Sequence, residues 1–174
     1  IVSGDFYWLD TIGDLEFLAS VDCTGHGVPG AFMSLIGYTS LSKIVREMNI
    51  YKPSDILNQL NIEITRSLQK QDTSGGAIQD GMDMSLICYN KKTQHLEFAG
   101  AFNPLWLVRN NDIEEIKADR FSIGSSSANI EKIFTNHEVP IQKGDFVYFF
   151  SDGIIDQFGG ESGKKFMAKP FKRL

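Results

Sequence analysis

The chain has 174 residues, of which 42% are hydrophobic and 13 are Phe, so it is long enough and apolar enough for one domain with a buried core. Its formal net charge is −5, and acidic and basic residues are spread along the chain without a basic stripe. This distribution argues against binding to a phosphate backbone, and we expect no nucleic-acid partner.

The first half of the chain predicts a hairpin followed by two helices. Two β-rich runs, residues 6–9 and 15–21, flank a turn-like segment at 11–14. Beyond Pro29, which a first helical turn tolerates, apolar residues recur mostly at three- and four-residue steps, so we expect a long buried helix. Its apolar residues are Val28, Ala31, Phe32, Leu35, Ile36, Ile44, Val45 and Met48. A second helix is predicted to begin at Pro53, with one apolar face packed against the first.

The second half predicts a long loop and then an antiparallel meander. Residues 69–81 lack any hydrophobic period, which favours a loop inside the domain. Strand-like runs follow, separated by turn residues, at 84–89, 96–99, 105–109, 113–116 and 133–141. Residues 146–150 are apolar throughout, which predicts a strand covered on both faces. Strands combined with two early helices indicate a layered α+β domain.

Cysteine use and hydropathy indicate the compartment. Cys23 and Cys88 form no spaced framework, which is typical of a reducing environment. No apolar run approaches the roughly 18 residues that span a bilayer, and no basic segment precedes a hydrophobic one at the N-terminus. We therefore expect a cytoplasmic domain that makes no membrane contact of its own, whether or not its parent protein is tethered to a membrane.

Three Asp residues stand at predicted strand ends: Asp5, Asp22 and Asp152. Strands of one sheet can bring such ends together, and Mg²⁺ and Mn²⁺ prefer carboxylate, carbonyl and water oxygens. Two such ions about 3.5–4 Å apart lower the pKa of a bridging water and neutralise a phosphate group. Any one Asp-Gly pair is ordinary turn chemistry, but the three together indicate a two-metal phosphoester site.

The motifs around these residues resemble those of a known family. The segments 2–7, 21–30, 80–84, 99–101 and 150–153 occur in the order seen in the SpoIIE-like branch of the PP2C-type (PPM) phosphatases. Residues 22–31, with the pattern Asp-x-x-Gly-His-Gly-x-Pro-x-Ala, are the most specific piece. The resemblance covers nearly the whole chain.

The resemblance implies a fold and an activity. It implies a four-layer α/β/β/α sandwich, two Mn²⁺ or Mg²⁺ ions, and hydrolysis of phosphoserine or phosphothreonine on a partner protein through a metal-bridged water. It also implies that residues 1–174 are a single phosphatase domain, which we expect to be truncated at both ends and cut from a larger signalling protein. The chain begins without Met, at Ile1, in what reads as the middle of a strand.

Position by position, Asp5, Asp22 and Asp152 match the metal-binding carboxylates of the family, and the backbone carbonyl of Cys23 matches a further ligand. The Asp-Asp pair that usually closes the family motif does not occur before Leu174. We therefore expect one of the two metal ions to bind poorly if this segment is isolated.

Other residues near these motifs have a functional and a structural interpretation. His26 either donates a proton to the leaving oxygen or holds its glycine-rich loop, and the structural role is the commoner for a lone His. Asp80 and Asp83 either hydrogen-bond metal-held water or shape the turn before a strand. Gly25 and Gly153, beside the ligand positions, give backbone or phosphate close access.

Competing classes are weighed by spacing and charge. A cysteine phosphatase needs Arg six positions after its Cys, but Pro29 follows Cys23 and Gln94 follows Cys88 at that distance. A two-metal nuclease is disfavoured by the absence of a basic surface in the sequence. The alternative that stays open is a catalytically inactive, pseudophosphatase-type domain that acts as a regulated protein-binding module.

The resemblance also implies partners. The expected substrate is a phosphorylated protein of the anti-sigma-factor-antagonist type. We also expect the two early helices to face an upstream sensor or dimerisation domain of the same chain that tunes metal occupancy.

Overall fold

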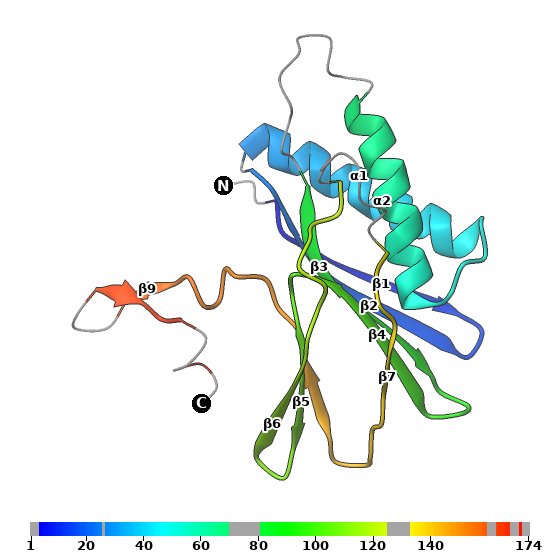
Figure 1. Ribbon diagram of the computed structural model, residues 1–174, viewed down its shortest axis with the longest axis vertical. Coiled ribbons are helices and arrows are strands. Elements are labelled where there is room, and N and C mark those ends of the chain that lie inside the picture. Colours follow the sequence, from blue (N-terminus) through cyan, green and yellow to red (C-terminus); the bar gives the residue numbers. More distant parts are fainter. Residues whose placement is uncertain are drawn as a thin grey trace.

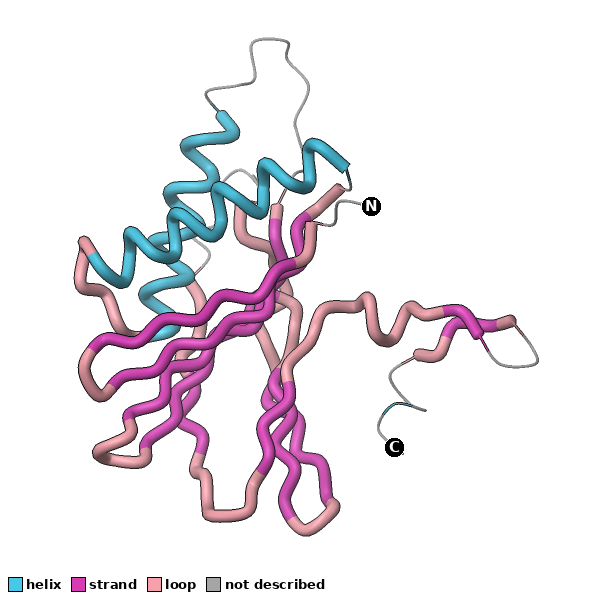
Figure 2. The backbone as a smooth tube through the Cα atoms, turned by 180° about the vertical axis from the view of Figure 1, so that it is seen from behind, coloured by secondary structure: helices cyan, strands magenta, loops and turns pink. Residues whose placement is uncertain are grey.

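The structure is a computed structural model that describes residues 4–25, 27–69, 81–124, 133–159, 163–167 and 171. Two helices lie together over one large sheet, and a smaller sheet adjoins its other side (Figure 1). Seen from behind, the chain after the smaller sheet runs away from both sheets (Figure 2). None of the described helices has the length and hydropathy of a bilayer-spanning segment.

The elements follow the order expected from the sequence. They are β1 (Phe6–Ile12), β2 (Leu15–Cys23), α1 (Gly27–Arg46), α2 (Pro53–Gln69), β3 (Met82–Asn90), β4 (His95–Ala101), β5 (Leu105–Arg109), β6 (Asp112–Ile116), β7 (His137–Val139), β8 (Phe146–Tyr148), β9 (Phe158–Gly159) and β10 (Lys164–Lys165). The strand predicted over 133–141 is reduced to the three residues of β7. The predicted loop over 69–81 falls largely on residues 70–80, outside the described residues.

Antiparallel pairing organises both main sheets. The larger has the order β1-β2-β3-β4-β7, the smaller has the order β6-β5-β8, and β9 and β10 form a separate hairpin. At the predicted turn between β5 and β6, Asn110 and Asn111 have φ values of +51° and +66°. Positive φ at both central residues is typical of a type I′ hairpin, whose twist matches that of the flanking strands. Antiparallel pairing of β3 with β4 and of β5 with β6 is therefore confirmed, but the prediction of one continuous meander is wrong, because β4 pairs with β7 while β5 and β6 belong to the smaller sheet.

The core has two parts, one on each face of the larger sheet. The helices cover one face, where Leu57, Leu60 and Ile64 of α2 are at most 1% exposed. Each such side chain contributes roughly 2–3 kcal/mol through burial. On the other face, Phe98 packs with Leu107 of the smaller sheet. The α+β sandwich predicted from the sequence is present as one helical layer and two sheet layers, and the described residues include no second helical layer over the smaller sheet.

The buried face of α1 differs from the prediction of a wholly buried helix. Val28, Phe32 and Leu35 are 59–68% exposed. The residues that pack inward are Gly30, Met33, Gly37, Leu41, Ile44 and Val45. Two glycines on this face bring the helix close to the sheet, and a hydrophobicity pattern does not register glycine as a core residue. An apolar stripe on the outer face of α1 is the result.

Polar contacts fix α1 against β1. The Arg46 guanidinium donates to both carboxylate oxygens of Asp10, with 2.7 Å between Nε and Oδ2. The Asp10 side chain is only 3% exposed, whereas that of Arg46 is 60% exposed. Trp8 of the same strand donates from Nε1 to the Ser42 hydroxyl at 3.1 Å. The first strand and the last two turns of α1 therefore hold one position relative to each other.

The prediction that residues 146–150 are covered on both faces is wrong. Phe146 is 62% exposed and Tyr148 is 48% exposed. Val147, which pairs with Leu107, faces the larger sheet and is partly buried. The strand is an edge strand of the smaller sheet, and its two aromatic rings lie on the outer face, which no described helix covers. The continuous apolar run therefore predicts a strand correctly here, but it does not predict that both faces of the strand are buried.

Candidate metal and phosphoester site

Strand register brings three acidic residues to one end of the larger sheet. Asp22, next to last in β2, pairs with Asp83, the second residue of β3. Asp5 directly precedes Phe6, which pairs with Val21, so the antiparallel register places Asp5 opposite Asp22. Paired positions in a sheet lie about 4.5–5.5 Å apart and share a face. The alternation of β1, β2 and β3 therefore delivers three carboxylates to the same place.

The fourth carboxylate arrives from the other sheet. After β8 the chain crosses to the end of the larger sheet, where the Ser151 hydroxyl donates to Asp5 Oδ2 at 2.7 Å. A Cβ placed on Gly153 would lie 3.6 Å from the same Asp5 oxygen. Asp152 stands between these two residues. The site is therefore assembled from segments almost 150 residues apart in the sequence.

The electrostatics of Asp22 shows how close the three ligand candidates lie. Its pKa is raised from 3.8 to about 7, first by partial burial and then by the negative charges of Asp5 and Asp152. Hydrogen bonds with the same two side chains also favour the protonated form. Like charges that share a site disfavour ionisation, so this cluster is short of positive charge.

Asp83 also lies near the negative charge of Asp152, but its hydrogen-bond partner is Ser122. Its pKa is raised first by burial and also by the charge of Asp152, while a hydrogen bond from the Ser122 hydroxyl lowers it. The serine holds one carboxylate oxygen of Asp83, at the edge of the cluster. The structure thus places Asp83 beside the predicted ligands, at the second position of β3.

The loop after β2 depends on close backbone approach. Gly25 has a φ of +94°, a conformation that side chains rarely adopt. A Cβ on Gly30 of α1 would lie 2.8 Å from the Gly25 carbonyl oxygen, so only glycine lets the helix begin this close to the loop. Thr24 donates its backbone N–H to the Gly81 carbonyl at 2.9 Å. The loop is held on one side by α1 and on the other by the start of β3.

The two atoms of Cys23 that matter chemically have different surroundings. Its side chain is 3% exposed, and burial raises the pKa of the thiol to about 12. Its carbonyl oxygen would lie only 2.8 Å from a Cβ on Gly4, so it sits against the strand that leads to Asp5. The thiol is therefore a packed group, and the carbonyl lies against the residue that precedes Asp5.

The predicted site residues separate into two groups. Asp5, Asp22, Asp152 and Asp83 are brought together, with Gly25 and Gly153 beside them. His26 and Asp80 lie outside the described residues. Ser151 and Ser122, which hold two of the carboxylates, were not predicted, because a serine beside a turn has no spacing that marks it.

The carboxylates form contacting pairs rather than a closed ligand shell. Within the described part of the chain, no three His, Cys, Asp or Glu side chains are grouped closely enough to hold a metal ion as they stand. The donors are nevertheless of the right kind, since carboxylate and carbonyl oxygens suit hard divalent cations. The raised pKa of Asp22 reports the excess negative charge that a cation would neutralise.

Comparison with known proteins identifies similar domains. A family model described as Stage II sporulation protein E (SpoIIE) matches residues 15–170, a range that includes Asp22 and Asp152 but not Asp5. The SiaA PP2C domain of Pseudomonas aeruginosa is 30% identical, with a TM-score of 0.85 over 99% of this chain and 65% of that chain. No curated protein sequence matches significantly.

Two further solved structures share the fold at lower identity. The PP2C phosphatase domain of SpoIIE from Bacillus subtilis, solved with a fragment of its regulatory domain, is 23% identical with a TM-score of 0.68. The match covers 89% of this chain and 42% of that one. RsbX in complex with magnesium is 12% identical with a TM-score of 0.64, over 88% and 68% of the two chains. The chain thus spans less than two thirds of the SiaA and SpoIIE chains.

Proposed function

We propose, from the premise that the chain belongs to the SpoIIE family of PP2C-type phosphatase domains, that it hydrolyses phosphoserine or phosphothreonine on a partner protein in a metal-dependent reaction. The observation that carries this proposal is the convergence of Asp5, Asp22 and Asp152, with the raised pKa of Asp22 as its electrostatic signature. Carboxylates held close together without a cation destabilise the folded protein, and a bound metal ion would offset that repulsion.

The residues present fit two divalent ions, Mn²⁺ or Mg²⁺. Asp5, Asp22, Asp152 and the Cys23 carbonyl would hold them, and one structural neighbour, RsbX, was solved with magnesium. Such ions supply a water of lowered pKa and positive charge for the phosphate oxygens.

Side chains of the protein fix the positions of the carboxylates. Ser151 fixes one oxygen of Asp5 by its 2.7 Å hydrogen bond, and Ser122 fixes one oxygen of Asp83. The buried Cys23 thiol, with its raised pKa, is unsuited to act as a nucleophile, which favours direct attack by water over a covalent intermediate. His26 stays a candidate proton donor to the leaving serine or threonine oxygen.

We also propose where regulation enters. The outer face of α1 presents Val28, Phe32 and Leu35, an apolar stripe suited to an upstream sensor or dimerisation region. The same helix contacts the segment before β1, because the Ser34 hydroxyl donates to the carbonyl of Gly4, the residue before Asp5, at 2.7 Å. A partner that shifts α1 would therefore shift the ligands and tune metal occupancy.

The proposed substrate is a phosphorylated protein of the anti-sigma-factor-antagonist type. A phosphorylated form of such a protein, compared with a general phosphoserine peptide, tests this part of the proposal. A turnover no faster on that protein than on the peptide would contradict the assigned partner and leave the hydrolase chemistry intact.

One observation favours the alternative, a pseudophosphatase that binds a partner without catalysis. No complete metal-ligand group is present among the described residues. Retention of Asp5, Asp22 and Asp152 favours the enzyme, because loss of one carboxylate would disable the metal site.

Phosphate release from a phosphoserine peptide in Mn²⁺ distinguishes the two functions. We expect activity in the protein, and its loss in EDTA and in the Asp22→Asn and Asp152→Asn variants. Asp14→Asn, in the exposed turn after β1, is the matched control and should keep full activity. Metal binding by calorimetry with no turnover of any phosphoester would instead establish the binding module.

A further inference from the structure

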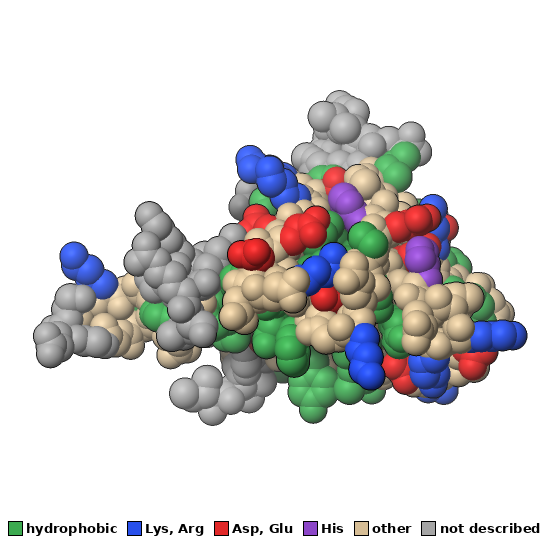
Figure 3. Space-filling model, turned by 90° about the horizontal axis from the view of Figure 1, so that it is seen from below, with side chains coloured by type: hydrophobic (Ala, Val, Ile, Leu, Met, Phe, Trp, Pro, Cys, Tyr) green, Lys and Arg blue, Asp and Glu red, His purple; other side chains and the backbone are tan. Residues whose placement is uncertain are grey.

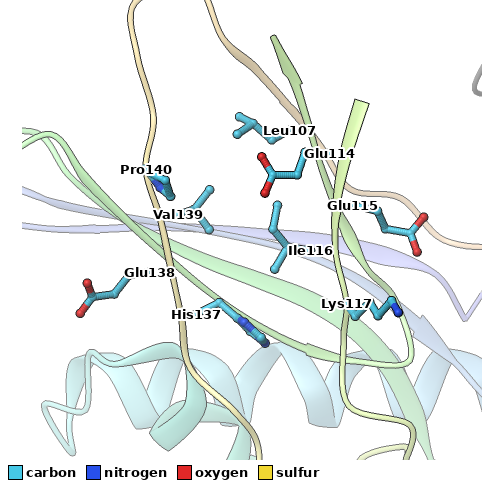
Figure 4. A pocket seen from close by; sticks show the side chains of 9 residues that line it. All are labelled: Leu107, Glu114, Glu115, Ile116, Lys117, His137, Glu138, Val139 and Pro140. Carbon is cyan, nitrogen blue, oxygen red and sulfur yellow. The ribbon is translucent and has the colours of Figure 1, made fainter. Parts of the chain in front are cut away.

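The sandwich is open along one edge, away from the candidate site. There β6, the edge strand of the smaller sheet, faces β7, the edge strand of the larger sheet. A cavity of about 410 Å³ lies between them. Its lining comes from β5, β6 and β7 and the residues after β6 and β7, and the side chains are drawn in Figure 4. This volume is within the range of ordinary ligand-binding pockets.

The cavity is lined by apolar and charged side chains, and the exposed Glu114 points across it. In Figure 4, Glu114 and Ile116 point from β6 toward β7, and Val139 points from β7 toward β6. The register agrees, because Glu114 pairs with Leu107, whose side chain belongs to the core between the sheets. An acid on the inner face of a sheet is unusual, and here it stands at the mouth of a cavity.

The rim of the cavity is also predominantly acidic. Glu115 and Glu138 line it from the outer faces of β6 and β7, and the basic residues among the described lining residues are Lys117 and His137. Glu138 is opposite Glu97 across the strands, and its carboxylate also lies 3.7 Å from Nε2 of His95. Figure 3, which views the molecule from below relative to Figure 1, shows acidic and basic side chains interspersed on that side. The excess of glutamate among the lining residues favours a cation.

The backbone at the cavity suits an extended ligand. Among the described strands, β6 pairs only with β5, and β7 pairs only with β4. Each therefore has one edge without a strand partner, and such edges accept an added strand from another chain. A lysine or arginine of that strand would lay its aliphatic stem on Ile116 and Val139 and bring its charge to Glu114.

We propose that the cavity between β6 and β7 is a docking site for an extended segment of a partner protein that carries a lysine or arginine. The site is distinct from the carboxylate cluster. The pairing of β7 begins at Leu96, whereas the end of β4 near the cluster is Ala101, on the order of 15 Å farther along the strand. The proposal does not depend on phosphatase activity.

A peptide titration tests the proposal in EDTA, so that metal chemistry plays no part. The probe is a labelled ten-residue peptide in which Lys alternates with Val, added at about 0.15 M salt, where charges more than about 8 Å apart are screened. We expect saturable binding by fluorescence anisotropy and amide NMR shifts centred on Leu107, Glu114 and Val139. The same peptide with Glu in place of Lys should not bind.

Two variants on one strand separate the site from general charge attraction. Glu114→Gln, on the inner face of β6, should weaken the Lys peptide at least about fivefold. Glu115→Gln, its neighbour on the outer face, makes the same change in net charge and should have less than a twofold effect. Equal weakening by both variants, NMR shifts centred elsewhere, or equal binding of the Glu peptide would overturn the proposal. Thermal melts confirm that each variant remains folded.

Discussion

Replacing Asp22 with Asn is expected to stabilise the metal-free protein at pH 8 while removing its response to metal. The pKa of Asp22 is raised from 3.8 to about 7 by burial and by the neighbouring charges of Asp5 and Asp152. An acid whose pKa is higher in the folded state than in the unfolded state costs stability once it ionises. That cost begins to develop above pH 3.8 and is complete above about pH 7.

The size of the effect follows from the same pKa. Each pKa unit corresponds to about 1.4 kcal/mol, so the difference between 3.8 and about 7 sets an upper bound of roughly 4 kcal/mol. Asp22 is only partly buried, and solvent screens part of the repulsion, so we expect a gain of about 1–2 kcal/mol for Asp22→Asn at pH 8. At pH 4 the gain should be close to zero.

Urea denaturation in EDTA at several pH values measures this difference. Asp14→Asn is the matched control, because Asp14 is exposed in the turn at the opposite end of β1. In Mn²⁺ the unmodified protein should gain stability as metal binds the folded state, and Asp22→Asn should not. A destabilised Asp22→Asn variant in EDTA at pH 8, or a gain that is the same at pH 4 and pH 8, would refute the reasoning.

Three further predictions concern parts of the fold that position the site. Gly30→Ala places a Cβ 2.8 Å from the backbone carbonyl oxygen of Gly25. We expect it to lower the free energy of unfolding by about 1–3 kcal/mol in urea denaturation and to lower metal affinity measured by calorimetry. An unchanged metal affinity would contradict the tight packing of α1 on the loop after β2. Asp10→Asn weakens the bidentate salt bridge to Arg46 of α1 and should lower the free energy of unfolding by about 1 kcal/mol, measured from the thermal midpoint. A loss below about 0.3 kcal/mol would contradict a stabilising role of this salt bridge. The pKa of Asp145 is lowered chiefly by hydrogen bonding from Arg109, so its stabilisation is present above pH 4 and is lost as pH falls below 3.8. The urea midpoint of Asp145→Asn should therefore be below that of the unmodified protein at pH 6 and approach it near pH 3, and a constant difference would contradict this assignment.

The sequence predicted local structure well where hydrophobic period and turn chemistry agree. The strand at 105–109, the Asn110–Asn111 turn and the helix beginning at Pro53 all appear as expected. The faces of elements were harder to predict. In α1 the apolar residues at 28, 32 and 35 lie outside, because glycines on the other side allow the helix to approach the sheet more closely.

The candidate site depended on information that is not local. No spacing rule places Asp152 beside Asp5; their positions at predicted strand ends and the order of the family motifs suggested it. The supporting serines carried no signal, because the role of Ser151 arises from where the chain crosses after β8. The cavity between β6 and β7 was likewise not foreseen, since the inward direction of Glu114 follows from strand register and not from composition.

The strand β8, which leads to Asp152, is a short edge strand with few pairing residues. It is held to β5 by three residue pairs, whereas β1 and β2 share seven. Local unfolding takes the least supported segments first, so fraying of β8 would release Asp152 while Asp5 and Asp22 stay in place. The fraction of molecules in which Asp152 lies beside Asp5 and Asp22 would then be governed by this opening equilibrium, with each 1.4 kcal/mol changing it about tenfold. Hydrogen exchange at the amides of β8 would therefore report on readiness for metal binding more directly than global stability does.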